Sequence, residues 1–234
     1  MDSAGSVLAV GSSSEPNYPV TPDAYQPTFI GGPGSSGDAH VTKFDPFGET
    51  LVYSTYFGGD GGESCTLTGL DAAQNLYFAL DSGSSDLPVT AGAYDSTYNG
   101  SFDTYVAKFS LPLAPWKVLG GGAIGATDVP NLAGQGALTV GSPARLSVRG
   151  AAVSAPASII VGLSAANLPF KGGTLVPMPT LIVPLLTSSQ GSLDLPFTWV
   201  NAPAGIDLFV QVWIKDTGAP TGYSATNALR MTSQ

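Results

Sequence analysis

One segment of the chain occurs twice, and this internal repeat limits the fold more than any single motif. Three pairs of stretches align in order: residues 1–7 with 70–76, 19–25 with 88–94, and 38–44 with 103–109. The first two pairs are offset by 69 residues and the third by 65, so four residues have dropped out of a loop. Self-similarity on this scale is typical of propellers, solenoids and other arrays. Because Met1 aligns with an ordinary apolar residue, Leu70, we expect the sequence to start inside a repeating unit.

The composition favours short strands joined by tight turns. The 234 residues include 30 Gly and 19 Pro, which disfavour long helices and suit turns. Only 11% of the residues are charged and the mean hydropathy is +0.20, whereas disordered chains combine low hydrophobicity with high net charge. The sequence has no apolar run near the roughly 20 residues of a membrane-spanning helix, and no signal peptide at its start. We therefore expect an all-β protein that does not span a membrane.

Runs of β-branched and aromatic residues mark the strands of the first half. Strands are expected at residues 5–11, 38–44, 51–57, 66–71, 75–80 and 103–109. Turns are expected at Asp45–Gly48, with Pro46 in the second position, and at Asp71–Asn75. Each copy of the repeat then supplies about four short strands, which is the content of one propeller blade.

Negative charge is concentrated in the first half of the chain. Residues 1–129 hold 14 Asp and Glu against 3 Lys and Arg, whereas residues 130–234 hold 3 against 5. An acidic surface without a basic cluster repels phosphate backbones, so we expect no nucleic-acid partner. The carboxylates are either ligands for cations or ordinary turn residues, and the sequence leaves both interpretations open.

Several segments of the repeat resemble a known family. The stretch LVYSTYFGGD at residues 51–60, the Pro-Val-Thr-x-x-Ala-Tyr segments and the Asp-x-x-Val-x-Lys-Phe segments resemble the SBBP β-propeller repeat of bacterial exported proteins. The resemblance covers residues 1 to about 110 and implies β-propeller blades of a secreted bacterial protein, located at the cell surface or outside the cell. After Phe109 the sequence departs from the pattern, because Leu-Pro-Leu-Ala-Pro-Trp replaces the expected strand.

Fewer than two copies of the repeat are present, whereas propellers typically close with about 4–8 blades. A blade in such an array buries its faces against its neighbours and cannot do so alone. We therefore expect either missing upstream blades or a sheet face that is covered by the second domain or by another copy in a homo-oligomer.

The second half of the sequence does not continue the repeat and differs from the first half in the spacing of its strand candidates. Residues 111–130 are rich in Pro and Gly and are expected to form a linker or a degenerate blade edge. Seven strand candidates follow, at residues 137–140, 144–148, 158–163, 180–186, 192–197, 208–215 and 225–231. This spacing predicts a β-sandwich over residues 131–234. The segment resembles C-terminal modules of secreted bacterial proteins, which are usually structural or adhesive.

One histidine and one cysteine restrict the chemistry that the chain can perform. A zinc site of His and Cys ligands cannot be built from His40 and Cys65 alone. Calcium binds carboxylate and carbonyl oxygens, so Asp60, Glu63 and Asp71 are the candidate ligands, and no organic cofactor is expected. His40 is the candidate catalytic base; because its repeat counterpart, Tyr105, is also aromatic, a ring with a packing role is the alternative interpretation.

Cys65 and the tyrosines have simpler interpretations. The acidic neighbours of Cys65 raise the pKa of a thiol, so Cys65 is expected to be a small packing residue and not a nucleophile. The aromatic residues of the first half, at strand spacing, either form the core or stack on sugars at a propeller mouth.

Three functions remain open from the sequence. The first is an extracellular binding or scaffolding module for a glycan, a peptide or a cell-surface partner. The alternative is a calcium-dependent hydrolase of a small lactone or ester, in which the metal polarises the carbonyl. The third is a purely structural assembly segment.

Overall fold

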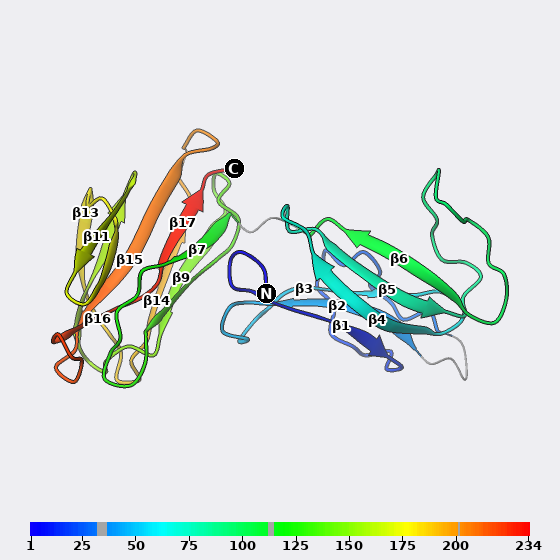
Figure 1. The fold of residues 1–234 in the computed structure, drawn as a ribbon, viewed down its shortest axis with the longest axis horizontal. Helices are drawn as coiled ribbons and strands as arrows, with labels where there is room; N and C mark the ends of the chain where they lie inside the picture. The colour runs from blue at the N-terminus through cyan, green and yellow to red at the C-terminus, as the bar shows by residue number, and fades with distance from the viewer. Residues whose placement is uncertain (32–36, 112–114, 201) are drawn as a thin grey trace. The chain divides into compact units, whose positions relative to one another are not determined.

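The computed structural model describes residues 1–31, 37–111, 115–200 and 202–234, and its described secondary structure consists of antiparallel strands (Figure 1). The chain divides into two compact units. The first unit lies within residues 1–2 and 6–113, and the second within residues 3–5 and 114–234. Within the described residues no helix has the length and apolar character needed to cross a membrane.

The first unit contains two three-stranded antiparallel sheets. The first sheet is formed by β1 (Val7–Ser13), β2 (Asp38–Phe44) and β3 (Leu51–Phe57) in that order. The second sheet is formed by β4 (Glu63–Leu70), β5 (Leu76–Ser82) and β6 (Asp103–Phe109). These are the six strands that the sequence predicts for this half: β2, β3 and β6 have the expected bounds, and the ends of β1, β4 and β5 differ by one to three residues. The described part of the chain forms no closed propeller.

The internal repeat is visible in the register of the strands. Val7 of β1 lies opposite Phe44 of β2, and the aligned pair Leu76 and Phe109 lie opposite each other in β5 and β6. The predicted turns are also present. The backbone nitrogen of Gly48 donates to the Asp45 carbonyl at 3.0 Å, and the Asp71–Asn75 turn is closed in the same way.

Each copy contributes three described strands to a sheet and not the four that we expected. The first copy has β3 beside β2, whereas β6 pairs only with β5 in the described structure. The strand that follows β6 is β7 (Trp116–Gly120), which begins as far after Phe109 as β3 begins after Phe44. However, β7 pairs with β17 of the second unit. No strand of the described residues therefore occupies the fourth position in the sheet of the second copy.

The core of the first unit lies between its two sheets. The face that the first sheet buries in this core is not the equivalent of the face that the second sheet buries. The first sheet contributes the face that carries Ala39 and Val41, here called the front face. The second sheet contributes its back face, with Phe78 of β5 and Ala107 of β6. Its own front face is open to solvent: Val106, the counterpart of the fully buried Val41, is 68% exposed. The sheets thus pack front to back.

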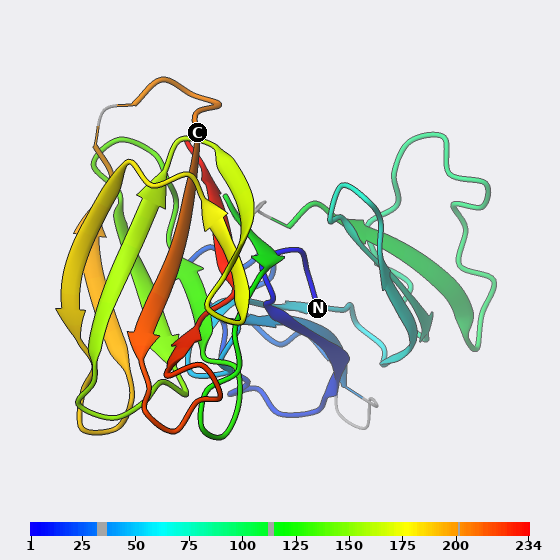
Figure 2. The same ribbon diagram turned by 60° about the vertical axis from the view of Figure 1, so that its left-hand side comes forward.

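The second unit holds the remaining strands. They are β7 (Trp116–Gly120), β8 (Asn131–Gln135), β9 (Pro143–Arg149), β10 (Pro156–Gly162), β11 (Ala165–Phe170), β12 (Gly173–Pro177), β13 (Leu181–Leu186), β14 (Leu193–Thr198), β15 (Asp207–Lys215), β16 (Tyr223–Ala225) and β17 (Ala228–Thr232). One sheet runs β13-β10-β15-β17-β7, with β16 also paired to β15. A second sheet runs β14-β9-β8, and β11 and β12 form a hairpin; Figure 2 shows these strands from a second side.

A large apolar core joins the two larger sheets of this unit. It includes Val212 of β15, Val148 of β9 and Trp116 of β7, all nearly or fully buried. Gly134 is required where β8 passes the Trp116 ring, because a Cβ at this position would lie 2.1 Å from Trp116 Cε3. The apolar patterns of β9, β10, β13, β14 and β15 were predictable from the sequence.

Several expectations for this half need correction. Residues 137–140 form no strand, and β8, β11, β12 and β16 were not expected. The segment 111–130, which we expected to be a linker or a degenerate blade edge, contains β7, whose Trp116 belongs to the core of the second unit. Residues 112–114 of that segment lie outside the described part of the chain.

Candidate functional site

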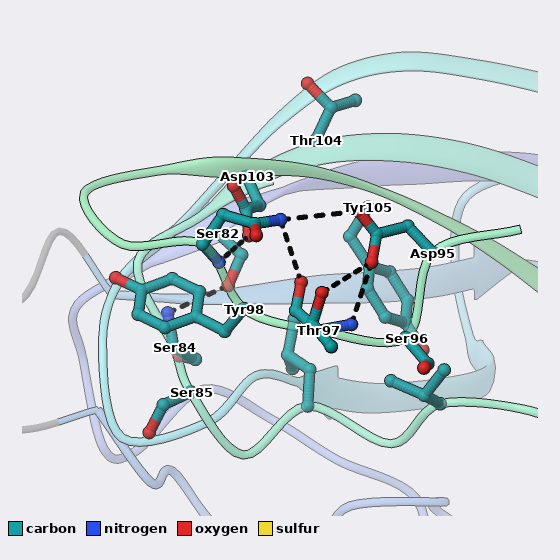
Figure 3. A pocket seen from close by; sticks show the side chains of 13 residues that line it. Ser82, Ser84, Ser85, Asp95, Ser96, Thr97, Tyr98, Asp103, Thr104 and Tyr105 are labelled. Carbon is teal, nitrogen blue, oxygen red and sulfur yellow. Dashed lines mark hydrogen bonds between the residues drawn. The ribbon is translucent and has the colours of Figure 1, made fainter.

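A long loop, residues 83–102, connects β5 and β6 and extends away from the sheet in both views (Figures 1 and 2). Between this loop and β6 lies a hollow of about 250 Å³, here called the loop hollow. Its lining (Figure 3) consists of Ser82, Ser84, Ser85, Leu87, Val89, Asp95, Ser96, Thr97, Tyr98, Asn99, Asp103, Thr104 and Tyr105. These residues present hydroxyl groups, two carboxylates and two phenol rings, and none of them is basic.

Hydrogen bonds within the loop hold the carboxylates of the loop hollow. Asp95 Oδ1 accepts from the backbone nitrogen and from Oγ1 of Thr97, at 2.9 and 2.7 Å. The backbone nitrogen of Asn99 donates to Asp103 Oδ2 at 2.7 Å. Figure 3 shows Asp95 and Thr97 on one side, and Asp103 and the Tyr98 ring on the other. The backbone hydrogen bond from Thr97 is the main cause that lowers the pKa of Asp95, so its carboxylate is ionised at neutral pH.

The first copy contains the counterpart of this loop. There the backbone nitrogen of Ile30 donates to Asp38 Oδ2 at 2.9 Å, just as Asn99 donates to Asp103. Ile30 and Asn99 are 69 residues apart, whereas Asp38 and Asp103 are 65 apart. The four-residue deletion therefore falls between these positions, and the two loops correspond residue by residue at an offset of 69 up to Asn99.

In the first copy, the place that corresponds to the loop hollow is filled by Tyr56 of β3. The Tyr56 hydroxyl donates to the Glu15 carbonyl at 2.6 Å and accepts from the backbone nitrogen of Tyr18 at 2.8 Å. Its ring centroid lies 5.9 Å from the ring centroids of both Tyr18 and Phe29. Tyr56 is only 1% exposed as a result.

The second copy keeps this socket but has no tyrosine in it. The counterparts of Glu15, Tyr18 and Phe29 are Ser84, Leu87 and Tyr98, and all three line the loop hollow. The tyrosine is missing because no described strand pairs with the free edge of β6. The loop hollow is therefore the counterpart of the Tyr56 socket, and no described side chain of its own sheet takes the place of Tyr56.

A second hollow of about 480 Å³ follows the same edge of β6 and is here called the edge hollow. Its lining consists of Tyr25, Tyr53, Phe57, Pro88, Thr90 and residues 105–110. In the first copy, the counterparts of Pro88 and Thr90 hold Ser54 of β3. Ser54 Oγ donates to the Pro19 carbonyl at 2.7 Å, and the backbone nitrogen of Thr21 donates to the Ser54 carbonyl at 3.0 Å. The edge hollow thus corresponds to the place of Ser54.

The structure does not bring the three candidate calcium ligands together. Asp60 lies in the loop after β3 and accepts from the Ser85 backbone nitrogen at 2.9 Å. Glu63 starts β4, is fully buried, and accepts from the Ser84 hydroxyl at 2.5 Å. Asp71 follows the last residue of β4, roughly 25 Å from Glu63 at the usual rise of a strand. Among the described residues no three His, Cys, Asp or Glu side chains are grouped to hold a metal ion.

His40 lies on the back face of the first sheet in a packing environment. Its ring stacks on Tyr18 with a centroid distance of 4.2 Å, and Nδ1 lies 3.5 Å from the Thr42 hydroxyl. Burial lowers the pKa of His40. Cys65 of β4 is half-buried, and burial raises the pKa of its thiol. The His40 ring therefore packs against Tyr18 and lies beside the Thr42 hydroxyl.

Comparison with known proteins gives no relative for this chain: no family model, curated protein or solved structure matches it.

The loop hollow was not among the sites that the sequence predicted. The signal that could have indicated it is the contrast between the well-aligned loop at residues 88–94 and the loss of the repeat pattern after Phe109.

Proposed function

We propose that the chain is a non-catalytic binding module, and that its ligand occupies the loop hollow of the first unit. In this proposal the two sheets of the first unit are incomplete blades of a β-propeller-like repeat, and the second unit is a β-sandwich. The resemblance of the repeat to bacterial exported proteins supports a location outside the cell or at its surface.

A single observation carries the proposal. The same socket occurs twice, and Tyr56 fills it in the first copy, whereas in the second copy Ser84, Leu87 and Tyr98 line an open hollow. Binding sites are typically concave, with an apolar wall and a few polar groups that orient the ligand. The loop hollow has that composition in Leu87 and the phenol rings, together with the hydroxyl and carboxylate groups.

The chemistry of the lining favours a neutral or cationic ligand that can form hydrogen bonds with hydroxyl and carboxylate groups. The lining residues include two carboxylates and no basic side chain, so an anionic ligand would be repelled. The calcium-dependent hydrolase gains no support, because it needs Asp60, Glu63 and Asp71 around one ion and Asp71 lies at the other end of β4. We therefore favour binding over catalysis.

The proposal is tested by titrating the isotopically labelled full chain with panels of neutral glycans and short peptides and following backbone amide resonances. A ligand of this site shifts the resonances of Thr97, Asn99 and Thr104. Tyr98→Ala weakens its binding at least tenfold. Tyr94→Ala is the matched control, because Tyr94 lies in the same loop, is fully exposed and does not line the hollow. Ligands that shift only resonances elsewhere would contradict the proposal.

A further inference from the structure

We propose that the ligand is an extended peptide that adds a fourth strand to the free edge of β6 and inserts a tyrosine into the loop hollow. This inference rests on the proposed function and names the ligand class of the same site. Peptides that add a strand to an open sheet edge gain affinity from backbone hydrogen bonds and specificity from alternate side chains.

The chain itself shows the geometry of such a complex. In the first copy β3 pairs with β2, and His40 lies opposite Tyr56 while Thr42 lies opposite Ser54. The second copy offers the same edge, with Tyr105 and Ala107 at the positions of His40 and Thr42. A peptide strand in the register of β3 therefore places one residue opposite Tyr105 and another, two residues earlier, opposite Ala107.

The two hollows match these two side chains. Residues two apart in a strand point to the same face. The residue opposite Tyr105 enters the loop hollow, whose counterpart holds Tyr56, and the residue opposite Ala107 enters the edge hollow, whose counterpart holds Ser54. Tyr105 lines both hollows, so they are adjacent along β6. The Pro88 carbonyl, the counterpart of the carbonyl that accepts from Ser54, already accepts from the Tyr105 hydroxyl. The expected ligand motif is therefore a small residue, any residue, and then a tyrosine.

The loop between β5 and β6 has the residues that would bind the backbone of the peptide. Thr21 holds β3 by donating from its backbone nitrogen to the Ser54 carbonyl and by accepting from the Ser54 nitrogen through Oγ1 at 3.1 Å. Its counterpart Thr90 is exposed and lines the edge hollow. Every residue from Pro88 to Phe102 is exposed, whereas the matching loop of the first copy buries Gln26 against β3. An added strand would cover this loop as β3 covers its counterpart.

The backbone of β3 also shows which amides of the peptide pair with β6. The nitrogens of Ser54 and Tyr56 donate outward, to Thr21 and Gln26. Because donors alternate along an antiparallel strand, the nitrogen of Thr55 points to β2. In a bound peptide the amide at the Thr55 position thus pairs with β6, while its side chain points to the open front face.

The test uses the full chain and a fluorescent peptide with the sequence of residues 50–58, flanked by lysines for solubility, measured by fluorescence anisotropy. We expect saturable binding. Alanine at the Tyr56 position, or N-methylation at the Thr55 position, weakens binding at least tenfold. Alanine at the Thr55 position, the control peptide, changes binding less than threefold.

Variants of the protein locate the site. Thr90→Val and Tyr98→Ala weaken peptide binding at least fivefold, and Thr68→Val, on the opposite edge strand β4, leaves it unchanged. Amide hydrogen exchange of Asp103–Phe109 slows on binding while that of β4 does not. No binding at millimolar peptide, equal binding of the alanine peptide, or protection of β4 in place of β6 would overturn the inference. If a glycan still shifts the resonances of the loop hollow, the proposed function stands and only the peptide assignment fails.

Discussion

The hydroxyl of Tyr56 and the backbone carbonyl of Glu15 are joined by a 2.6 Å hydrogen bond that ties β3 to the loop after β1. The same hydroxyl accepts from the backbone nitrogen of Tyr18. Two nearby backbone groups of this loop are thus fixed to one buried phenol oxygen on a strand that is distant in the sequence. This contact explains why the loop of the first copy lies against its sheet, whereas the loop at residues 83–102, which has no such partner, extends from it.

Tyr56→Phe is therefore expected to destabilise the first unit. The ring still fills its socket, but the Tyr18 nitrogen and the Glu15 carbonyl lose their partner in a largely buried place. The expected loss is about 1–3 kcal/mol in the free energy of local opening, measured by hydrogen exchange of β3 peptides. Tyr98→Phe is the matched control, because its hydroxyl donates to the Ser101 carbonyl at an exposed position. Equal losses in the two variants would show that the buried hydroxyl is not special.

Gly58→Ala tests the close packing of two buried carboxylates. A Cβ at Gly58 would lie 2.5 Å from Glu63 Oε2 and 2.6 Å from Asp38 Cγ, and both side chains are fully buried and hydrogen-bonded. Neither can move away cheaply, so we expect a loss of about 1–3 kcal/mol, again by hydrogen exchange of β2 and β3.

Gly69→Ala is the control for that substitution. Gly69 lies in β4, and an added Cβ meets no atom within 4 Å. Its expected effect on the free energy of opening is within about 0.5 kcal/mol. If Gly58→Ala is as mild as Gly69→Ala, the two carboxylates are less tightly held than their contacts indicate.

His40→Tyr tests the environment of the single histidine. Burial lowers the pKa of folded His40, so between the ordinary value of about 6.5 and the lowered one the unfolded chain binds a proton that the folded chain does not. The free energy of unfolding should therefore fall as pH decreases from 7 towards 5. Tyrosine stands at the aligned position 105, so the variant keeps an aromatic ring and removes the titrating group.

The measurement is urea unfolding at pH 7.0, 6.0 and 5.0 for both proteins. Asp71 and Asp95 have pKa values lowered by their hydrogen bonds, and their contribution is lost only as pH falls below about 4, outside this range. The wild-type chain should lose more stability over the range than His40→Tyr does. Parallel slopes for the two proteins would show that His40 titrates alike in the folded and unfolded chain.

The strands of the first unit could be predicted because each has a local signal. Leu51–Phe57 consists of β-branched and aromatic residues, and the repeat fixes the register of β2 and β6. Local pattern does not show which sheet a strand joins. Trp116–Gly120 follows β6 as β3 follows β2, but it pairs with β17 because the Trp116 side chain is buried in the core of the second unit.

The candidate site was less predictable, because it too depends on how the strands are arranged in space and not on a local sequence pattern. Asp60, Glu63 and Asp71 are close in sequence, but the intervening strand β4 is extended and separates the last of them from the others. The loop hollow exists because a strand is absent from one edge, and absence of a pairing partner leaves no local motif. Comparing the two copies position by position, with the contacts of Tyr56 known, is what identifies it.

Gln211→Met tests a buried polar hub of the second unit. Gln211 is fully buried in β15, and its Nε2 donates to the carbonyls of Gly121, Thr174 and Thr226 at 3.0–3.1 Å. Its Oε1 accepts from the backbone nitrogen of Val176 at 3.1 Å. Methionine has a similar volume but makes none of these bonds, so several buried polar groups lose their partner. We expect a loss of about 2–4 kcal/mol in the free energy of unfolding.

All three tryptophans of the chain lie in the second unit, so tryptophan fluorescence during urea unfolding reports on this unit. Trp213 is a direct reporter, because its Nε1 donates to Gln211 Oε1 at 3.2 Å, and its emission should change in the folded variant. Gln190→Met is the matched control, since Gln190 is exposed in the turn between β13 and β14. A Gln211→Met midpoint equal to that of the control would mean that other groups or water satisfy the freed carbonyls, and that the hub does not hold β12 against β15.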